Sequence, residues 1–233
     1  MNIGSRLKAV AKLVKPTSVL ADIGTDHAYL PTYLVEKNII EKAIASDIAQ
    51  GPYQQACETI SMHGLKNKIE ARLGSGLTSL KPGEATCLTI CGMGASTSIE
   101  SFEEAPLVLA SAKQLVLQPM NGAASLRKWL GEHGWVIDAE LLVDDEPYFY
   151  EIISAQQGGI KAYSLKEQIL GPKLIEERPA LFEKHLKRQI NFHKQLLKNM
   201  SKSETARSSK KFQELSHVLS ILEGVHDDTC NSK

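Results

Sequence analysis

The first half of the chain alternates short apolar runs, rich in β-branched residues, with segments whose apolar residues recur at helical spacing. This alternation continues to about residue 157 and is typical of a parallel β-sheet whose strands are joined by crossover helices. Strands are predicted at 19–23, 43–46, 69–73, 88–90 and 115–117, and helices at 4–14, 29–37, 52–63, 96–103 and 123–133. The pattern therefore predicts an α/β protein.

Two longer apolar runs follow, at 136–143 and 149–155. The segment between them, 144–147, contains two aspartates and a proline, which are residues that favour turns. These two runs are predicted to form an antiparallel hairpin that closes the sheet. Gly158 and Gly159 come directly afterwards and predict a linker.

Beyond the linker the apolar residues change to a heptad pattern. They are Leu186, Ile190, His193, Leu197 and Met200 in one segment, and Phe212, Leu215, Leu219 and Leu222 in the next. The polar residues 201–203 suit a turn, so residues 180–224 are predicted to form an antiparallel helical hairpin similar to a short coiled coil. His193 is predicted to be a packed core residue rather than a ligand. The chain accordingly divides into two expected domains, 1–158 and 159–233.

Composition excludes several classes of protein. Of the 233 residues, 42% are hydrophobic and 23% charged, which is too apolar for a disordered chain. No run approaches the ~18 apolar residues that a membrane span needs, and lysines and arginines interrupt the first 15 residues, unlike a secretory signal. The four cysteines show neither CxxC pairs nor zinc-finger spacing. We expect a cytoplasmic protein without a metal or a disulfide framework.

The formal charge is zero, with 27 basic and 27 acidic residues, but it is unevenly distributed. Residues 1–160 carry 13 basic and 18 acidic side chains, whereas residues 161–233 carry 14 basic and nine acidic ones. Nine lysines and arginines, opposed only by Glu204, lie within 184–211. Such a segment is typical of a surface that binds nucleic-acid phosphates. A solvated helix face is the alternative interpretation. The predicted RNA-binding residues are Lys187, Arg188, Lys194 and Lys198.

The segment VLADIGTDHAYLP, residues 19–31, carries the clearest functional pattern. A strand ends at Asp22, Gly24 permits a tight turn, and a helix follows, which is where open α/β sheets bind ligands. The carboxylates of Asp22 and Asp26 would repel a phosphate but would attract a cation. The glycine pattern of dinucleotide-binding proteins is also missing. These features favour S-adenosylmethionine, which carries a sulfonium and an ammonium group, over NAD.

Further residues at the ends of predicted strands support an adenosine ligand. Asp47 ends the second strand, where a carboxylate binds ribose hydroxyls. The third strand runs into Gly74-Ser75-Gly76, a tight loop able to flank an adenine, and the fourth runs into a glycine-rich turn at 91–95. Cys91 in that turn has no base beside it in the sequence, so it is predicted to be a small buried residue rather than a nucleophile.

The segments ADIGTDHAYLP, AIASDIAQGP, RLG-x-G, CGMG, LQP, LRKWL-x-x-x-GW and YEII occur in this order. With these motifs, residues 3–157 resemble the bacterial tRNA (adenine-22-N1)-methyltransferase family, within the class I S-adenosylmethionine-dependent methyltransferases. The resemblance implies a Rossmann-like methyltransferase sheet followed by a helical, coiled-coil-like hairpin. It also implies methylation of adenine N1 at tRNA position 22. The implied cofactor contacts are Asp22, Gly24, Asp26, His27, Asp47, Ile48, Gly74, Ser75 and Gly92.

Three positions depart from the family pattern. The family usually has Asp at the position of Ser75, a second Gly at the position of Ala95, and Asn at the position of Met120. Asn121 follows one place later. A serine hydroxyl can still accept a hydrogen bond from the adenine amine of the cofactor, at an expected cost of ~1 kcal/mol relative to a carboxylate.

The reaction implied by the resemblance needs no general base, because adenine N1 carries a free lone pair at neutral pH. Catalysis is then expected to come from positioning and electrostatics. Asp26 is predicted to support the cationic cofactor or product, and Gln118, with the 92–95 turn, to place the target base. We expect a monomer that binds tRNA. A small-molecule methyltransferase and a non-catalytic RNA-binding protein stay open as alternatives.

Overall fold

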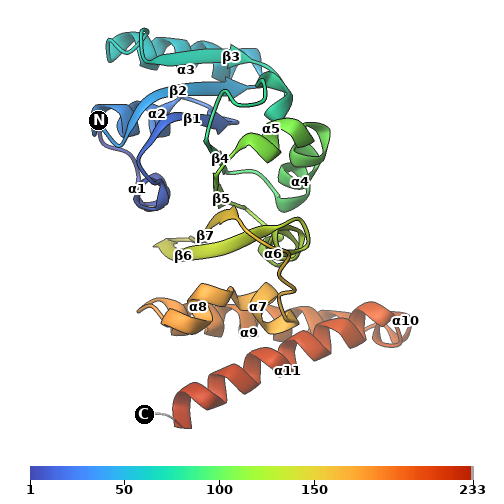
Figure 1. The fold of residues 1–233 in the computed structure, drawn as a ribbon. Coiled ribbons are helices and arrows are strands. Elements are labelled where there is room, and N and C mark those ends of the chain that lie inside the picture. The colour runs from blue at the N-terminus through green and yellow to red at the C-terminus, as the bar shows by residue number, and fades with distance from the viewer. Residues whose placement is uncertain (232–233) are drawn as a thin grey trace.

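A seven-stranded sheet with the order β3-β2-β1-β4-β5-β7-β6 forms the centre of the molecule (Figure 1). The computed structural model describes residues 1–231. The strands are β1 (Thr17–Ile23), β2 (Ile40–Asp47), β3 (Ile69–Leu73), β4 (Cys87–Cys91), β5 (Gln114–Gln118), β6 (Trp135–Asp145) and β7 (Tyr148–Gln157). The pairs among β1 to β5 are parallel, and β7 is antiparallel to both β5 and β6. All seven predicted strands are confirmed.

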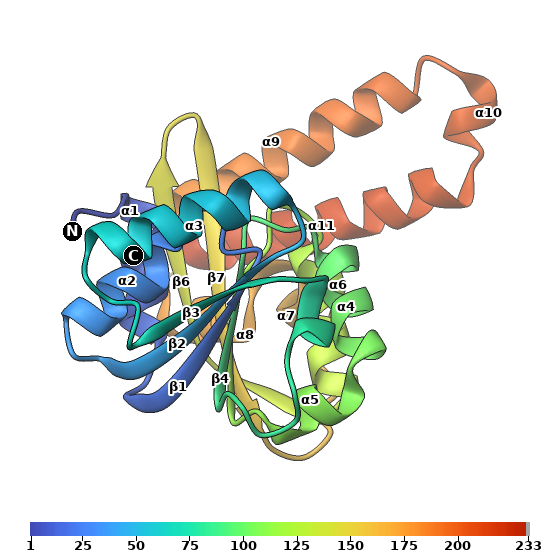
Figure 2. The same cartoon turned by 90° about the horizontal axis from the view of Figure 1, so that it is seen from above.

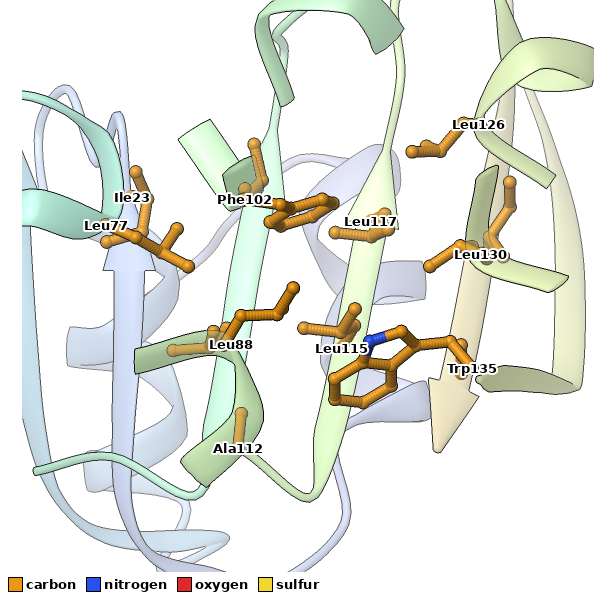
Figure 3. Close-up of a cluster of buried hydrophobic side chains, with 14 of the residues drawn as sticks. Ile23, Leu77, Leu88, Phe102, Ala112, Leu115, Leu117, Leu126, Leu130 and Trp135 are labelled. Carbon is orange, nitrogen blue, oxygen red and sulfur yellow. The ribbon is translucent and has the colours of Figure 1, made fainter. Parts of the chain in front are cut away.

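Helices cover both faces of the sheet. On one face lie α1 (Ser5–Leu13), α2 (Tyr29–Glu36) and α3 (Gln50–Met62), and on the other lie α4 (Ala95–Glu104), α5 (Pro106–Ser111), α6 (Ala123–Glu132) and the 3-10 turn η1 (Gly76–Ser79). Successive side chains of a strand point to opposite faces. Leu117 accordingly packs with Phe102 of α4 (Figure 3), whereas Val116 packs with α1 and α2 residues. The two cores hold the strand ends of the sheet in fixed register.

The β6–β7 hairpin extends past the end of its neighbour. The final β5–β7 pair is Leu117 with Ile153, so β7 continues from there toward Tyr148 beyond the end of β5. Because β7 is antiparallel to both neighbours, β6 runs parallel to β5. The hairpin turn at Glu146-Pro147 therefore lies at the same edge of the sheet as the carboxyl ends of β1, β4 and β5, and it projects there (Figure 2).

The C-terminal part consists of helices that cover the β6 edge of the sheet (Figure 1). They are α7 (Leu165–Leu170), α8 (Pro172–Glu177), α9 (Phe182–Met200), α10 (Glu204–Arg207) and α11 (Lys210–Asn231). Helices α9 and α11 lie antiparallel and form the expected hairpin over 180–224 (Figure 2). The turn between them is longer than predicted, because it contains α10. Helices α7 and α8 were not expected from the sequence.

The prediction that His193 is a core residue is only partly confirmed. His193 is half-buried, with its ring against the carbonyl of Gln189, whereas His185 of the same helix is 3% exposed. The first half of α9 packs on the β6–β7 hairpin as well as on α11, and the second half extends away from the sheet (Figure 2). Burial lowers the pKa of His185 and outweighs the opposing effect of Glu151.

A buried ion cluster joins the C-terminal helices to the sheet. Arg127 of α6 is fully buried and donates hydrogen bonds to Glu140 of β6 over 2.7 Å and to Glu151 of β7 over 2.5 Å. Its third nitrogen donates to the carbonyl of Gln168 in α7, and the other oxygen of Glu140 accepts the backbone N–H of Lys173 in α8. Removal of one partner from such a cluster leaves an unpaired buried charge.

The predicted linker at Gly158-Gly159 is also held against the sheet domain. The N–H of Gly158 donates to the carbonyl of Gly134, and that of Lys161 to the carbonyl of Gly131. The hydroxyl of buried Tyr163 accepts the N–H of Ile137. The connection between the two parts of the chain is therefore packed along most of its length, and the division at 158/159 stays a prediction.

Candidate active site

A cavity of about 630 Å³ lies at the carboxyl ends of β1, β2, β3 and β4. This volume is within the range of small-molecule sites. The cavity brings together every residue predicted to bind the cofactor: Asp22, Gly24, Asp26, His27, Asp47, Ile48, Gly74, Ser75 and Gly92. Their contacts with a cofactor stay a prediction, but their convergence on one cavity from four strand ends is a finding.

Asp22, at the floor of the cavity, is buried near the end of β1. Its carboxylate accepts hydrogen bonds from the hydroxyls of Thr25 over 2.7 Å and Thr89 over 2.6 Å. Burial nevertheless raises the pKa of Asp22 to about 6, although both hydroxyls and the guanidinium of Arg6 oppose the shift. The site therefore holds a carboxylate whose negative charge is poorly compensated by the protein alone.

The loop after β1 has an uncommon backbone. Gly24, Asp26 and Ala28 all have positive φ, of 68°, 54° and 54°. At Gly24 a side chain would also collide with Met93, whose Cε lies 2.2 Å from the position of a Cβ atom. Non-glycine residues rarely adopt this conformation, and strain of this kind is concentrated at functional sites. The loop turns the Asp26 side chain outward, where it is 68% exposed at the cavity.

Asp47 fixes the neighbouring wall. One carboxylate oxygen accepts the backbone N–H of Asp26 and the other accepts that of Ala49. The carbonyl of Asp47 accepts the N–H of Gly74, which attaches the loop after β3. Ile48, which follows, is 70% exposed and lines the cavity. Three of the loops around the cavity are thus joined through one residue.

Gln118, predicted to place the target base, is not among the cavity-lining residues and is completely buried. Its Oε1 accepts a hydrogen bond of 2.6 Å from Nη1 of Arg6, and its Nε2 donates to the carbonyl of Pro119. Arg6 itself lines the cavity. The amide of Gln118 is thus occupied by Arg6 and Pro119, and its role in placing the target base stays a prediction.

The turn at 91–95 is joined to the segment after β5. The N–H of Ala95 donates to the carbonyl of Asn121, and the N–H of Met120 donates to the carbonyl of Met93. Ala95 is buried, and Met120 is 48% exposed. The Asn121 side chain lies beside Gly94, with Oδ1 3.1 Å from the position of a Cβ atom there. Ala95 and Met120, two of the three departures from the family pattern, thus belong to one small structural unit beside the cavity.

Cys91 lines the cavity, and the interpretation that it is no nucleophile agrees with its surroundings. Burial is the main cause that raises the pKa of its thiol far above the ordinary value, and the nearby Asp22 raises it further. A protonated thiol is a poor nucleophile at neutral pH. Cys57, Cys87 and Cys91 are all free thiols, and the side chain of Cys230 lies outside the described residues. The side chains that the structure describes, those of residues 1–227, include no cluster of three potential metal ligands.

Sequence reasoning missed several cavity residues. Arg6 comes from the first helix, and Tyr29 stacks on His27 at the mouth, with ring centroids 5.0 Å apart. Glu100 and Glu104 of α4 also line the cavity. The Glu100–Glu104 spacing of four residues places both side chains on one helix face, which is a signal that the sequence contained. Nothing in the sequence near Arg6 pointed to the cavity.

The four predicted RNA-binding residues lie on two different faces of α9. Lys187, Lys194 and Lys198 recur at intervals of seven and four residues and share one face. Lys194 pairs there with Glu223 of α11 over 2.8 Å. Arg188 projects from another face toward the β6–β7 hairpin, where it contacts Phe149 and the carbonyl of Pro147. Their contact with RNA stays a prediction.

The strand order, with one antiparallel strand inserted next to the sheet edge, and the acid-lined cavity at the carboxyl ends of β1 and β2 define a Rossmann-like class I methyltransferase. A sequence model of the tRNA (adenine(22)-N(1))-methyltransferase family matches residues 20–223. The chain belongs to this family.

Comparisons with individual proteins agree with this assignment. The chain is 32% identical to the tRNA (adenine(22)-N(1))-methyltransferase of Bacillus subtilis, over 97% of this chain and 98% of that protein. It is similar in structure to Streptococcus pneumoniae Sp1610 in complex with S-adenosyl-L-methionine, with a TM-score of 0.86, 34% identity, and coverage of 97% and 100%. M. capricolum TrmK in complex with S-adenosyl-homocysteine gives a TM-score of 0.83, 27% identity, and coverage of 97% and 98%. None of the helices within residues 1–231 is long and apolar enough to cross a membrane.

Proposed function

We propose that this protein transfers the methyl group of S-adenosyl-L-methionine to N1 of adenine 22 in tRNA. The observation that carries the proposal is the cavity in which Asp22, Asp47 and the glycine loops after β1, β3 and β4 converge, in a chain that belongs to the adenine-22 family over residues 20–223. The predicted tRNA partner follows from the same family membership.

The residues of the cavity fit this cofactor. Asp47, held by two backbone N–H groups, presents acceptor oxygens suited to the ribose hydroxyls. Asp22, buried and poorly compensated, suits the positively charged methionine end. Ser75 and Gly74 flank the expected position of the adenine, and His27 and Ile48 also line the cavity. When bound, the cofactor supplies an activated methyl group on a positively charged sulfur.

The role of the protein in methyl transfer is mainly positional. Adenine N1 attacks through its own lone pair, so no side chain has to remove a proton before attack. The turn from Gly92 to Ala95 forms the surface next to which the base is held. Gln118 supports this region through Arg6 and through its backbone carbonyl, which accepts the N–H of Gly92. Asp26 faces the cavity with an exposed carboxylate, which stabilises positive charge on the cofactor or on the methylated base. Adenine N1 is inaccessible in a stacked or paired base, so the target nucleotide has to be extruded.

The helical part, expected as a domain over 159–233, holds the folded RNA through its phosphates. Lys187, Arg188, Lys194 and Lys198 provide positive charge along α9, which starts beside the β6–β7 hairpin at the cavity edge of the sheet. Such contacts recognise the shape of the RNA rather than its sequence. The enzyme is proposed to act as a monomer, in the cytoplasm, where tRNA is processed.

The decisive experiment is methylation of unmodified tRNA transcripts. Purified protein is incubated with isotope-labelled S-adenosyl-L-methionine and a bacterial tRNA transcript that has adenine at position 22. The methylated nucleoside is then located by nuclease digestion and mass spectrometry. A transcript with guanine at position 22 is the matched control for the substrate, and Asp47→Ala is the control for the enzyme.

The expected result is 1-methyladenosine at position 22 alone, absent from both controls. Methylation at another position would show that the protein is a tRNA methyltransferase with a target other than adenine 22. Cofactor binding without transfer to any tRNA would favour a non-catalytic RNA-binding protein. Transfer to a small molecule together with no affinity for tRNA would favour a small-molecule methyltransferase.

A further inference from the structure

Two aromatic rings lie side by side at the end of the β6–β7 hairpin. Tyr148 and Tyr150 are two residues apart on β7, so both point to the same face of the strand. Their ring centroids are 6.0 Å apart and the rings are inclined by 24°. Tyr148 is 57% exposed and Tyr150 is half-buried. The outer face of the pair is thus accessible to a planar group from solution.

This aromatic pair adjoins the cavity through Arg6. The guanidinium of Arg6 lies over the ring of Tyr150, 5.6 Å from its centroid, and the same group donates to Gln118 and lines the cavity. The hydroxyl of Ser5 donates to Asp145 over 2.8 Å, which fixes the start of α1 to the hairpin. Arg6 therefore forms a continuous surface between the tyrosines and the place where the target base is proposed to lie.

The opposite face of the same hairpin is attached to the basic helix. Phe149, between the two tyrosines, stacks on His185 with centroids 5.2 Å apart, and Arg188 lies over the Phe149 ring. Arg188 also donates to the carbonyl of Pro147. The end of the hairpin projects at the cavity edge of the sheet and lies beside the first half of α9 (Figure 2). The tyrosines of this hairpin therefore lie between the proposed RNA-binding helix and Arg6 at the cavity.

We propose that Tyr148, supported by Tyr150, is the stacking surface for an unpaired nucleobase that flanks the extruded adenine. This inference rests on the proposed function. Extrusion of one nucleotide removes a stacking partner from its neighbours, and an exposed aromatic ring replaces that partner. Stacking on a tyrosine accepts any base, because every base has a π face. Tyr148 is accordingly a positioning residue for the substrate, and it makes no contact with the cofactor.

Substitutions at Tyr148 test the proposal. Tyr148→Phe keeps the ring, whereas Tyr148→Leu keeps apolar bulk but removes the π face. Leu107→Ala is a control at a 72% exposed apolar residue of α5, distant from this edge of the sheet. For each variant we would measure the KM and kcat with tRNA, the Kd for S-adenosyl-L-methionine by calorimetry, and the melting temperature. A tRNA carrying 2-aminopurine at position 21 or 23 reports stacking of the neighbouring base by fluorescence quenching.

We expect Tyr148→Leu to raise the KM for tRNA by roughly 5- to 150-fold, the range for loss of one stacked base. Tyr148→Phe should keep the wild-type KM. In both variants the cofactor affinity and the melting temperature should equal those of the wild type. Quenching of 2-aminopurine should occur with the wild type and Tyr148→Phe but not with Tyr148→Leu. If the wild type methylates tRNA and all three proteins have equal KM and quenching, the stacking role is overturned while the proposed function stands. A wild type that methylates no tRNA would instead overturn the proposed function.

Discussion

The backbone N–H of Asp26 donates a hydrogen bond of 3.1 Å to a carboxylate oxygen of Asp47, 21 residues later in the chain. This bond attaches the loop after β1, with its left-handed Asp26 and Ala28, to the end of β2. The same carboxylate faces the cavity. One side chain therefore both shapes the loop and presents the acceptors that a ribose needs.

Replacement of this carboxylate should abolish cofactor binding. Asp47→Ala removes the acceptors for two ribose hydroxyls, each worth roughly 1.5–3 kcal/mol to a charged partner, and it also releases the Asp26 loop. We expect the Kd for S-adenosyl-L-methionine to rise at least about 100-fold in calorimetry. Asp138→Ala on β6, which removes a carboxylate paired with Lys15 outside the cavity, should leave the Kd unchanged. Near-normal binding by Asp47→Ala would show that the cofactor lies elsewhere.

Cofactor affinity should depend on the protonation of Asp22. Its pKa of about 6 means that the neutral carboxyl group is favoured below that pH, whereas the cationic ligand binds the charged form. Affinity should therefore decrease as the pH falls through 6, approaching about tenfold per pH unit at lower pH. The stability of the folded protein changes with pH in the opposite direction. The raised pKa gives the ligand-free protein a stability contribution that is present at low pH and is lost as the pH rises through about 6.

Calorimetry between about pH 5 and pH 7 checks this prediction. Asp22→Asn should bind S-adenosyl-L-methionine weakly and without pH dependence over this window. His27→Gln removes a histidine that also lines the cavity and serves as the control, because histidines ordinarily titrate in the same range. If the pH dependence disappears in His27→Gln and persists in Asp22→Asn, the assignment to Asp22 is wrong.

A carboxylate at position 75 should strengthen cofactor binding. Ser75 is exposed in the loop after β3 and lines the cavity, at the position where the family usually has Asp. Ser75→Asp offers a charged acceptor to the adenine amine, which is worth ~1 kcal/mol more than a hydroxyl and corresponds to about fivefold tighter binding. Ser75→Ala should bind more weakly than the wild type. An order of affinity other than Asp, Ser, Ala at this position would contradict the placement of the adenine.

The shared face of α9 should contribute to tRNA affinity through charge alone. Combined replacement of Lys187, Lys194 and Lys198 by glutamine should weaken tRNA binding. It should also lower the slope of log affinity against log salt by about 2 to 3, because each phosphate contact contributes ~0.7–0.9. The Kd for S-adenosyl-L-methionine should not change.

A matched triple variant controls for the change in net charge. Lys42, Lys66 and Lys68 are exposed on the β2 and β3 side of the sheet, so their replacement by glutamine changes the net charge equally at a distance from α9. Filter binding at several salt concentrations compares the two variants. Equal losses of affinity would indicate a general effect of net charge, and the specific role of the α9 face would be rejected.

The buried ion cluster should dominate the stability of the junction between sheet and helices. Arg127→Leu leaves Glu140 and Glu151 without their cation, and we expect a loss of about 3–5 kcal/mol in the free energy of unfolding. The neighbouring exposed pair Lys128–Glu132 supplies the control, since Lys128→Leu should cost less than about 0.5 kcal/mol. Urea denaturation measures both. Hydrogen exchange in α7 and α8 should accelerate in Arg127→Leu, and unchanged exchange there would show that the cluster does not fasten these helices.

The strands were predictable because each is a short apolar run bounded by turn residues. The cavity residues from Asp22 to Gly92 were also predictable, because the carboxyl ends of parallel strands must meet at one edge. Helices α5, α7 and α8 have six residues each, which is less than two turns and too short for a periodic pattern. These helices depend on tertiary packing for their stability.

The role of Arg6 could not be predicted, because it is created by a contact across 112 residues of sequence. Its own segment shows only a basic residue on an amphipathic helix. Gln118 illustrates the converse. Its position at the end of β5 correctly suggested proximity to the site, but the sequence could not show that its amide is already bonded to Arg6 and the Pro119 carbonyl. Local pattern places a residue near a site and does not determine which atoms face the ligand.

The contact between Arg127 and the carbonyl of Gln168 has a consequence for substrate choice. This buried charge cluster fastens α7 and α8 to the sheet, so a tRNA held along α9 as proposed would lie at a fixed distance from the cavity. A transfer RNA gripped by its elbow or stem then offers only the nucleotide that lies at that distance. One adenosine among many would thus be selected by its distance from the bound phosphates, without recognition of the neighbouring bases.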